Sequence, residues 1–587
     1  MRVPKEHPWS ESETNLIKIE INHLLDIGAI SKCHPCKDQF ISDIFLVQKP
    51  GGKFRLVMNL KKFNTFLSTS HFKLEDRRTV TKLLSKDCYM ATLDLKEAYY
   101  SVKIHSNSKK YLRFYFQNQL YEYNCLCFGV SVAPFVFTKI LKPVVAKLRS
   151  KGLLSVVYLD DFIVFADSYT LCMENLKQTT NLLTKLGFVV NDKKSTSPSK
   201  ICTFLGFCFN SEKMLLYLPK SKHLKTISLC SRLISLSRCS IHFLAQVIGF
   251  LVSVCPATQY GWLYLKQLER AKCLALHKSG GSYKTIISIQ RNLKLDLQWW
   301  LDNICYSQKD LKMKPYMLTI YSDSSLKGWG SVCGKETIAG QWSATEREYH
   351  INYLELKAAF LGLKYFASDL QGINILLRID NITAIAYINR MGGTRHPHLN
   401  SLAREIWQWC EIRRLWIFAS YIESKNNKEA DTESRRIVKE TEWELNMTYY
   451  NQIISKLGKP TLDLFASRTN FKCSRYVSWK NDPDALAVDA FTLDWTEEFF
   501  YAFPPFILIL PVLKKIIEER ATGIVVVPYW VMQPWFPLFK KLACSNWIIL
   551  PPKIDLLLSV DRRPHRLWQQ TSLVAAILSG KRFTEKE

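Results

Sequence analysis

Three aspartates in the first third of the chain have the types and spacing of a metal-dependent site. Asp94 ends the hydrophobic run in YMATLDLKEAYYSV, and Asp160 and Asp161 separate two apolar runs in VVYLDDFIVFA. A strand carrying Asp94 beside a hairpin carrying the other two would cluster three carboxylates, which a divalent cation relieves. Carboxylate oxygens suit Mg²⁺, and two such ions activate a primer 3′-hydroxyl and stabilise a leaving pyrophosphate. An Asp-Asp pair alone is more often a solvated turn, so the surrounding segments decide.

A second set of acids comes from four separate segments of the chain. Asp323 lies in IYSDSSLKGWGSV, a predicted strand, and Glu355 lies in INYLELKAAFLGL, a predicted helix. Asp380 ends the strand predicted in ILLRIDNITAIAYI, and Asp431 lies in the polar stretch NNKEADTESR. Each acid alone is more often a surface residue or a helix cap. Together, four acids from four elements can hold two metal ions that activate water against a phosphodiester.

The charge of the chain predicts a polyanionic partner. The 587 residues carry 80 Lys and Arg against 52 Asp and Glu, a net charge of +28. Residues 1–300 hold 43 basic and 21 acidic side chains, so the partner should bind mainly there. Such an excess indicates nucleic acid or an acidic membrane surface. The length predicts three to five domains, and the 13% aromatic content excludes disorder driven by polarity.

Nothing in the sequence predicts secretion or membrane insertion. The N-terminal MRVPKEHPWSESE is polar, and the most apolar windows are short or broken by proline. The 17 cysteines are scattered, which fits reduced thiols in the cytosol or nucleus. Cys33 and Cys36 form a single CxxC without a second pair to complete a zinc site. We therefore expect a cytoplasmic or nuclear protein that binds nucleic acid and no membrane.

In sequence order, five segments resemble the motifs of a reverse transcriptase over about residues 15–215. They are KPGGKFRLVMNLKKFN, LDLKEAYYSV, CFGVSVAPFVFTKIL, YLDD and NDKKSTSPSKICTFLGF. The resemblance implies a right-hand polymerase with fingers and palm in 1–215 and a basic thumb and connection in 216–314. It makes Asp94, Asp160 and Asp161 the catalytic ligands of two Mg²⁺ or Mn²⁺ ions. The implied partners are an RNA template, a DNA primer and dNTPs.

The same resemblance assigns roles to residues around the aspartates. Arg55 and Lys53, in two strands predicted on either side of a Gly-Gly turn, would hold the nucleotide triphosphate. Tyr99 would be the steric gate against a ribose 2′-hydroxyl, and Gly129 would let the backbone approach the base pair. Lys194 would be the general acid for pyrophosphate.

Two positions depart from the polymerase pattern. Asn59 stands where many relatives carry Asp, and Phe128 stands where retroviral enzymes carry Gln. Neither change removes a metal ligand. The basic stretch 201–300, with 13 basic and 3 acidic side chains, is expected to follow duplex phosphates without reading sequence.

Residues 315–440 resemble a ribonuclease H domain, on the order Asp323, Glu355, Asp380 and Asp431. The resemblance implies two Mg²⁺ or Mn²⁺ ions on these four residues and cleavage of an RNA–DNA hybrid. The last motif departs from gypsy-like relatives, which carry His and Gly where this chain has Tyr421 and Lys425. The aspartate itself is retained, so we expect activity.

Residues 441–587 resemble the domain that follows ribonuclease H in DIRS-like retrotransposons, which is similar to Dam-type adenine methyltransferases. Asp463 in TLDLFAS would lie in a cofactor-loop position, and the methyltransferase motif would comprise Pro504, Pro505 and Phe506. In such enzymes an Asp or Asn before the prolines binds the target amino group, but this chain has Phe503. We therefore expect a structural or nucleic-acid-binding domain rather than methyl transfer from S-adenosylmethionine.

The combined interpretation is a multidomain α/β and α+β protein, the polymerase polyprotein of a DIRS-like retrotransposon whose recombinase is encoded separately. It would copy RNA and DNA into DNA and degrade the RNA strand. A gypsy-like or pararetroviral polymerase is the first alternative, and an integrase or protease in the parent reading frame would favour it. A domesticated, non-catalytic nucleic-acid-binding protein is the second alternative, and the intact acidic residues speak against it.

Overall fold

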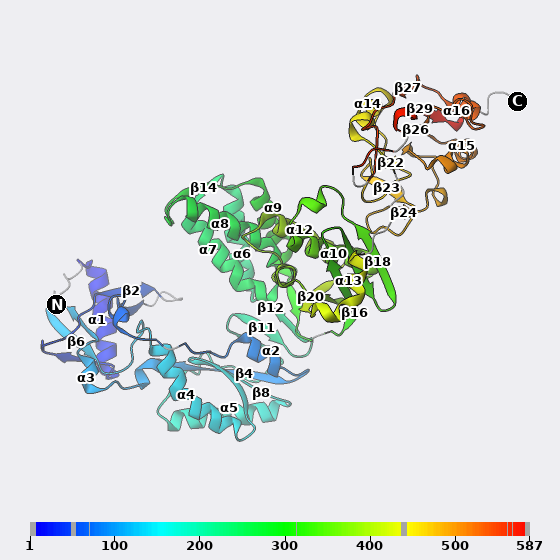
Figure 1. Ribbon diagram of the computed structural model, residues 1–587. Helices are drawn as coiled ribbons and strands as arrows, with labels where there is room; N and C mark the ends of the chain where they lie inside the picture. The colour runs from blue at the N-terminus through cyan, green and yellow to red at the C-terminus, as the bar shows by residue number, and fades with distance from the viewer. Residues whose placement is uncertain are drawn as a thin grey trace. The chain divides into compact units, whose positions relative to one another are not determined.

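The computed structural model describes residues 8–48, 54–69, 71–312, 314–435, 443–559, 562–565 and 568–581 (Figure 1). The chain divides into two compact units, of which the first comprises residues 1–231, 253–259 and 300–313. The second comprises residues 232–252, 260–299 and 314–587. Residues 216–314, predicted as thumb and connection, contribute to both units. Among the described residues, no helix combines the length and apolar character needed to cross a membrane.

The first unit begins with a helix packed on two small antiparallel sheets. Ser10 and Glu13 form a capping box that starts helix α1 (Glu11–Asp26). One sheet has the order β1-β6-β5, and the other is the β2-β3 pair with Ile44 opposite Met58. The strands are β1 (Ile30–Cys33), β2 (Ile44–Gln48), β3 (Phe54–Met58), β5 (Arg113–Phe116) and β6 (Gln119–Tyr123). The two predicted strands around the Gly-Gly turn are confirmed, while the turn lies outside the described residues.

An antiparallel sheet of order β7-β8-β4-β9 forms the centre of the first unit. Its strands are β4 (Tyr89–Lys96), β7 (Leu154–Tyr158), β8 (Asp161–Ala166) and β9 (Val189–Val190). Helices α4 (Ala133–Arg149) and α5 (Tyr169–Lys185) pack on it, with Phe137 and Leu183 in its hydrophobic core. The hairpin predicted around YLDD is confirmed, because β7 pairs with β8 and Leu159 turns the chain with a φ of 55°.

A third sheet joins distant parts of the chain within the first unit. It has the order β10-β11-β12-β15, so that residues 308–310 pair with residues 215–217. The strands are β10 (Ile201–Phe204), β11 (Phe207–Asn210), β12 (Leu215–Tyr217) and β15 (Gln308–Asp310). Between β12 and β15 the chain forms the helices α6 (Lys220–Ser235), α7 (Ile241–Val254), α8 (Lys266–Lys278) and α9 (Arg291–Asn303) and the short strand pair β13 (Arg238–Ser240) and β14 (Ile286–Ser288). Two short helices occur earlier in the chain, α2 (Arg77–Leu83) and α3 (Ser106–Lys109).

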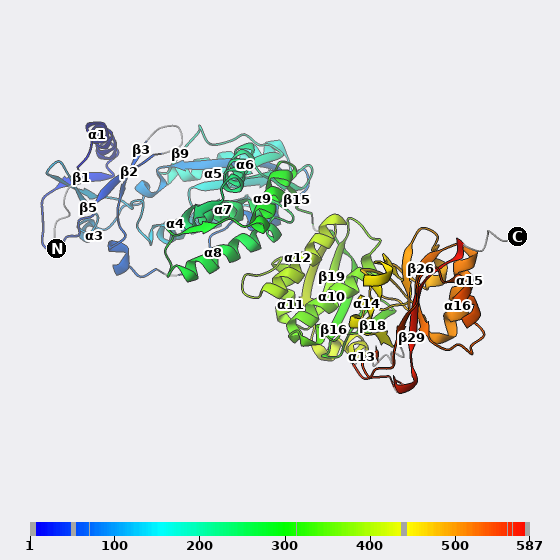
Figure 2. The same ribbon diagram turned by 90° about the horizontal axis from the view of Figure 1, so that it is seen from above.

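The second unit contains a mixed sheet of order β18-β17-β16-β19-β20. The first three strands are antiparallel, and β19 and β20 run parallel to β16. The strands are β16 (Tyr316–Ser324), β17 (Gly328–Cys333), β18 (Glu336–Gln341), β19 (Asn374–Ile379) and β20 (Trp416–Tyr421). Helices α10 (Ile351–Ala367) and α12 (Pro397–Ile412) lie alongside this sheet (Figure 2), followed in size by α11 (Ile382–Asn389) and α13 (Lys428–Arg435).

Glycines set the close approach of two helices to this sheet. A Cβ on Gly362 of α10 would lie 2.4 Å from the Ser331 Oγ of β17. A Cβ on Gly330 of β17 would lie 2.5 Å from the Ser434 backbone nitrogen of α13. Any side chain at these positions would therefore push α10 or α13 away from β17.

A seven-stranded sheet of order β24-β23-β22-β25-β26-β29-β27 follows in the second unit. Strands β22 to β26 are parallel, β29 is antiparallel to both neighbours, and the order reverses between β22 and β25. The strands are β22 (Leu462–Asp463), β23 (Arg475–Ser478), β24 (Ala487–Val488), β25 (Phe499–Ala502), β26 (Thr522–Pro528), β27 (Ile548–Leu550) and β29 (Leu573–Ser579).

Two separate hydrophobic clusters cover this sheet. One contains Val512 of α15 (Ile509–Glu518) and Phe539 of α16 (Phe536–Leu542), and the other contains Ile453 of α14 (Met447–Leu457). The short pair β21 (Glu444–Leu445) and β28 (Leu557–Leu558) lies beside the second cluster. Helices on both faces of a mostly parallel sheet define a doubly wound α/β arrangement.

Candidate active sites

Strand pairing brings the first three aspartates together. Asp94 in β4 lies opposite Asp161 at the start of β8 in the antiparallel register. Asp160 occupies the turn before β8, and its carbonyl oxygen accepts a hydrogen bond of 3.0 Å from the Leu95 nitrogen. Asp94 and the Asp160–Asp161 pair, 66 and 67 positions apart in sequence, therefore become neighbours at one end of the sheet, as the sequence predicted.

Two side chains from the segment after β9 hold Asp94. Asn191 Nδ2 donates to Asp94 Oδ2 at 2.8 Å, and Lys194 Nζ donates to Asp94 Oδ1 at 3.0 Å. Asp94 is buried, whereas most of the Lys194 side chain is exposed. The bond to Asp94 raises the pKa of Lys194, so the amine stays a cation at neutral pH. This placement gives Lys194 a proton to donate beside the aspartates.

The aspartates themselves form a cluster of like charges. Burial, followed by the charges of Asp160 and Asp94, raises the pKa of Asp161 to about 6. Burial is also the main cause that raises the pKa of Asp160. Such shifts mark carboxylates that lack enough neutralising charge, and a divalent cation supplies it. The donor set therefore fits Mg²⁺ or Mn²⁺.

The residues predicted to contact the nucleotide gather around Phe128. The Arg55 guanidinium lies over the Phe128 ring, 4.1 Å from its centroid, and the Tyr99 ring centroid lies 5.1 Å from it. Burial and the nearby Asp160 raise the pKa of Tyr99 to about 12, so its hydroxyl remains neutral. The sequence showed Phe128 only as a departure from retroviral enzymes, and its contact with Arg55 was missed. Lys53 lies outside the described residues.

Gly129 occupies a backbone position that favours glycine. Its φ is +99°, and an added Cβ would lie 3.5 Å from the Met58 carbonyl oxygen, so conformation rather than space restricts the position. Asn64 fixes this loop by donating to the Gly129 carbonyl at 2.9 Å and accepting from the Ser131 nitrogen at 2.9 Å.

The second cluster comprises Asp323, Glu355 and Asp380, which are three of the four acids that the sequence predicted to hold metal ions together. One carboxylate oxygen from each lies within 4.8 Å of the other two. Strand β16 carries Asp323, helix α10 carries Glu355, and Asp380 follows β19. Serine hydroxyls orient two of them, because Ser434 Oγ donates to Asp323 Oδ2 at 2.6 Å and Ser424 Oγ donates to Asp380 Oδ2 at 2.8 Å.

Glu355 is the residue of this cluster whose surroundings point most clearly to a cation ligand. It is 5% exposed, and its buried Oε2 has no hydrogen-bond partner among the described residues. Burial, followed by the charges of Asp323 and Asp380, raises the pKa of Glu355 to about 9. Burial likewise raises the pKa of Asp323 to about 6. An unpaired buried carboxylate oxygen beside two further carboxylates fits Mg²⁺ or Mn²⁺.

Asp431, the fourth predicted ligand, is oriented differently. Its carboxylate pairs with Arg435 one turn later on α13, at 2.6 Å. It does not belong to the group of three oxygens described above. Its charge nevertheless contributes to the raised pKa of Asp323, so it lies in the same electrostatic environment. Both contacts of Arg435 go to Asp431 Oδ1, so they leave the Oδ2 oxygen for a metal ion.

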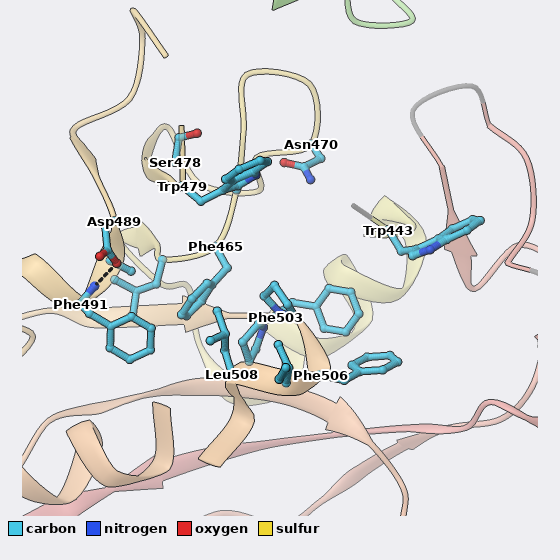
Figure 3. Close-up of a pocket in the computed structure, with 16 residues that line it drawn as sticks. Trp443, Phe465, Asn470, Ser478, Trp479, Asp489, Phe491, Phe503, Phe506 and Leu508 are labelled. Carbon is cyan, nitrogen blue, oxygen red and sulfur yellow. Dashed lines mark hydrogen bonds between the residues drawn. The ribbon is translucent and has the colours of Figure 1, made fainter. Parts of the chain in front are cut away.

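The C-terminal motif residues separate into two environments. Asp463 is buried at the end of β22, and its carboxylate accepts from the Phe465 and Lys472 nitrogens at 3.3 and 2.9 Å. Pro504, Pro505 and Phe506 instead line a pocket of about 650 Å³ (Figure 3). Asp463 therefore stabilises the loop, while the proline motif faces open space.

Comparison with known proteins assigns part of the chain to a family. Residues 47–209 match the family model described as reverse transcriptase (RNA-dependent DNA polymerase). The enzymatic polyprotein of Figwort mosaic virus (strain DxS) is 24% identical over 409 residues, covering 65% of this chain and 56% of that protein. The Pol polyprotein of the transposon opus from Drosophila melanogaster is 26% identical over 213 residues, covering 35% of this chain and 21% of that protein.

A solved foamy viral protease-reverse transcriptase in complex with double-stranded DNA is 17% identical and covers 71% of each chain, with a TM-score of 0.46. The match to the family model, and not this structural likeness, identifies residues 47–209 as a reverse-transcriptase domain. Their relatives are polyproteins of the retroelement and pararetrovirus type. The chain spans 56% of the length of the figwort virus protein and less of the transposon protein.

Proposed function

We propose that the chain copies RNA and DNA templates into DNA and cleaves the RNA strand of the resulting hybrid. The observation that carries the proposal is the pairing of Asp94 with Asp161 beside Asp160, inside the segment that matches the reverse transcriptase family. The domain limits that we propose remain 1–215, 216–314, 315–440 and 441–587.

In the polymerase site, Asp94, Asp160 and Asp161 would hold two Mg²⁺ or Mn²⁺ ions. When bound, these ions lower the pKa of the primer 3′-hydroxyl and neutralise charge on the pyrophosphate. Asn191 orients the Asp94 carboxylate through its 2.8 Å hydrogen bond, and the Lys194 ammonium holds a proton for the leaving group. Arg55, stacked on Phe128, would bind the triphosphate of the incoming dNTP.

The Tyr99 ring packs on Phe128 at 5.1 Å and on Phe137 at 5.3 Å, which fixes its position. A fixed ring at the sugar position would exclude a ribose 2′-hydroxyl and so select dNTPs. In the nuclease site, Asp323, Glu355 and Asp380 would hold two ions, and Asp431 would contribute its Oδ2, which Arg435 does not contact. The ions would supply an activated water, while the Ser434 and Ser424 hydroxyls keep two carboxylates in place.

A primer-extension assay tests the polymerase proposal. The purified chain with an RNA template, a DNA primer, dNTPs and Mg²⁺ should extend the primer. Asp160→Asn should abolish extension, and Asp380→Asn is the matched control that should retain it while leaving a labelled RNA strand intact. Equal extension by wild type and Asp160→Asn would refute the assignment of the aspartates. Extension by the wild type would also exclude a domesticated, non-catalytic binding protein.

We further propose that the parent element is a DIRS-like retrotransposon with a separately encoded recombinase. The doubly wound sheet after the second carboxylate cluster supports a methyltransferase-like C-terminal domain. The alternative, a gypsy-like or pararetroviral polymerase, is favoured by the similarity to the figwort virus polyprotein. An integrase or aspartic protease in the parent reading frame would decide for the alternative, and a recombinase frame beside it would decide for the DIRS-like element.

We propose that the C-terminal domain does not methylate DNA. Phe503 removes the polar group that would bind an amino substrate, and Asp463 is already engaged by two backbone nitrogens. Transfer of a labelled methyl group from S-adenosylmethionine to DNA by the purified chain would contradict this proposal.

A further inference from the structure

The seven-stranded sheet carries a pocket of about 650 Å³ at the ends of its parallel strands. Its walls come from the segments that end or directly follow β22, β23, β24 and β25 (Figure 3). Strand order reverses between β22 and β25, and open α/β sheets bind their ligands at such a reversal. The volume lies in the range of pockets that enclose a small organic group.

Six of the sixteen residues that line the pocket are aromatic. Phe465, Phe491, Phe503 and Phe506 surround its inner part, and Trp479 lies across the space from them (Figure 3). No lysine, arginine or glycine is present among the described residues that line it. Aromatic walls stack on planar rings, whereas a diphosphate needs cations or a close glycine backbone. The lining therefore fits a planar, uncharged ring and not a dinucleotide.

Asp489 supplies a hydrogen-bond acceptor at the edge of this pocket. Its φ of +68° is rare for a residue with a side chain, and strain of this kind concentrates at ligand sites. Its Oδ1 accepts from the Phe491 nitrogen at 3.0 Å, and its Oδ2 has no partner among the described residues. A carboxylate oxygen at the rim of an aromatic pocket suits an exocyclic amine or a sugar hydroxyl.

We propose that this pocket binds an unpaired nucleobase of a nucleic-acid strand by stacking, without transferring a methyl group. The ligand chemistry is a planar base with its sugar, which a free nucleoside shares. The rim favours a strand, because Trp479 is 62% exposed and offers an outer face to a neighbouring base. Lys480 Nζ lies 5.6 Å from the Trp479 ring centroid and places a cation where a backbone phosphate would run. The inference rests on the proposed function, in which the chain handles single-stranded templates.

Photo-cross-linking tests the pocket on the full chain. A short single-stranded DNA carrying one azidoadenine is irradiated with the protein, and the labelled peptides are mapped by mass spectrometry. The label should appear in peptides that contain Phe465, Trp479 or Phe506. Label confined to residues 47–209 would overturn the proposal. In the second arm, adenosine or S-adenosylmethionine is added in excess. If the free nucleoside binds the pocket but the strand alone leaves no label there, the proposal of a strand-binding pocket is also overturned.

Two variants of pocket residues and one control variant outside the pocket test the proposal further. Trp479→Ala should raise the strand concentration that gives half-maximal labelling of the pocket about tenfold. This change corresponds to about 1.4 kcal/mol of binding free energy. Asp489→Asn keeps the side-chain shape and should reduce the preference for an adenine over an abasic position. Phe471→Ala removes an exposed aromatic ring outside the pocket and should leave labelling unchanged. Equal labelling of the Trp479→Ala and Phe471→Ala variants would refute the proposal that the pocket binds a nucleobase.

Primer extension by the same preparations separates the two proposals. Extension with no pocket label would refute only the nucleobase site. Pocket label without extension would refute the polymerase proposal while retaining the nucleobase site as a single-strand contact.

Discussion

The two carboxylate clusters balance their negative charge in different ways. In the first, the Lys194 ammonium bonds Asp94, and the pKa of Asp161 rises only to about 6. In the second, serine hydroxyls orient two of the acids, and Glu355 Oε2 has no hydrogen-bond partner within the described part of the chain. The pKa of Glu355 rises to about 9. Asp161 in the first cluster is therefore mostly ionised at neutral pH before any metal binds. The second holds a proton that a metal ion must displace.

The largest expected effect is the loss of one activity without loss of the other when a carboxylate of one cluster is replaced. Replacing one metal-binding carboxylate, as in Asp161→Asn, should lower the rate of primer extension by about a thousandfold, since metal-ion catalysis contributes several kcal/mol. Hybrid cleavage by the same variant should stay at the wild-type rate. Rates are measured from the primer and the labelled RNA in separate reactions. Parallel loss of both activities would mean that the clusters are not independent.

The second largest expected effect is on the pH dependence of the free energy of unfolding in the absence of metal ions, which should differ between the two clusters. Glu355 has an ordinary pKa of 4.5 when unfolded and about 9 when folded, so the folded state binds the extra proton between these values. Stability should therefore fall as pH rises from about 4.5 to about 9 and become constant above that range. Urea denaturation in chelator measures it. Glu355→Gln should remove most of this slope, and an unchanged slope would contradict the buried, protonated state of Glu355.

Lys194 tests the charge balance in the first cluster. Lys194→Met should slow extension about a hundredfold, the lower range for loss of a general acid. Lys194→Arg keeps a cation near Asp94 but binds its proton more tightly, so it should remain slow. Single-turnover extension measures both variants. Wild-type speed in Lys194→Arg would assign Lys194 to positioning Asp94 instead.

A smaller effect is expected from the hydroxyl that orients Asp323. Ser434 Oγ donates to this carboxylate at 2.6 Å, and hydrogen bonds to charged groups contribute about 1.5–3 kcal/mol. Ser434→Ala should slow hybrid cleavage about tenfold and leave primer extension unchanged. Ser424→Ala, at the matched bond to Asp380, should behave similarly. A wild-type cleavage rate in both variants would show that the carboxylates need no such support.

The smallest expected change concerns the ring beneath Arg55. Phe128→Leu keeps an apolar side chain but loses the cation–π contact of 4.1 Å, which contributes about 0.5–2 kcal/mol. The KM for dNTP should rise a few-fold with little change in kcat. Steady-state extension at varied dNTP concentration measures it. A fall in kcat at constant KM would place Phe128 in the chemical step instead.

The sequence predicted the elements better than the contacts between them. The hairpin around Asp160 was predictable because two apolar runs of strand length flank the acidic pair. The contact between Arg55 and Phe128 was not, since it depends on how strand β3 and a remote turn fold against each other. Asp431 and Arg435 are four residues apart, the spacing of an ion pair on one face of a helix. The sequence nevertheless gave no reason to expect this ion pair at a residue predicted to bind metal. The aromatic pocket was also missed, because strands of two residues such as β22 and β24 carry no periodicity.

The central claim is that two independent carboxylate clusters perform two reactions on one nucleic acid. One reaction with a labelled DNA primer on a differently labelled RNA template measures both at once. The wild type should extend the primer and cut the RNA along the extended hybrid. Asp160→Asn should leave the primer unextended and cut the RNA only where the primer pairs with it, yet cleave a longer preformed hybrid, and Asp323→Asn should extend without cleaving. Extension by Asp160→Asn, or hybrid cleavage by Asp323→Asn, would contradict the account.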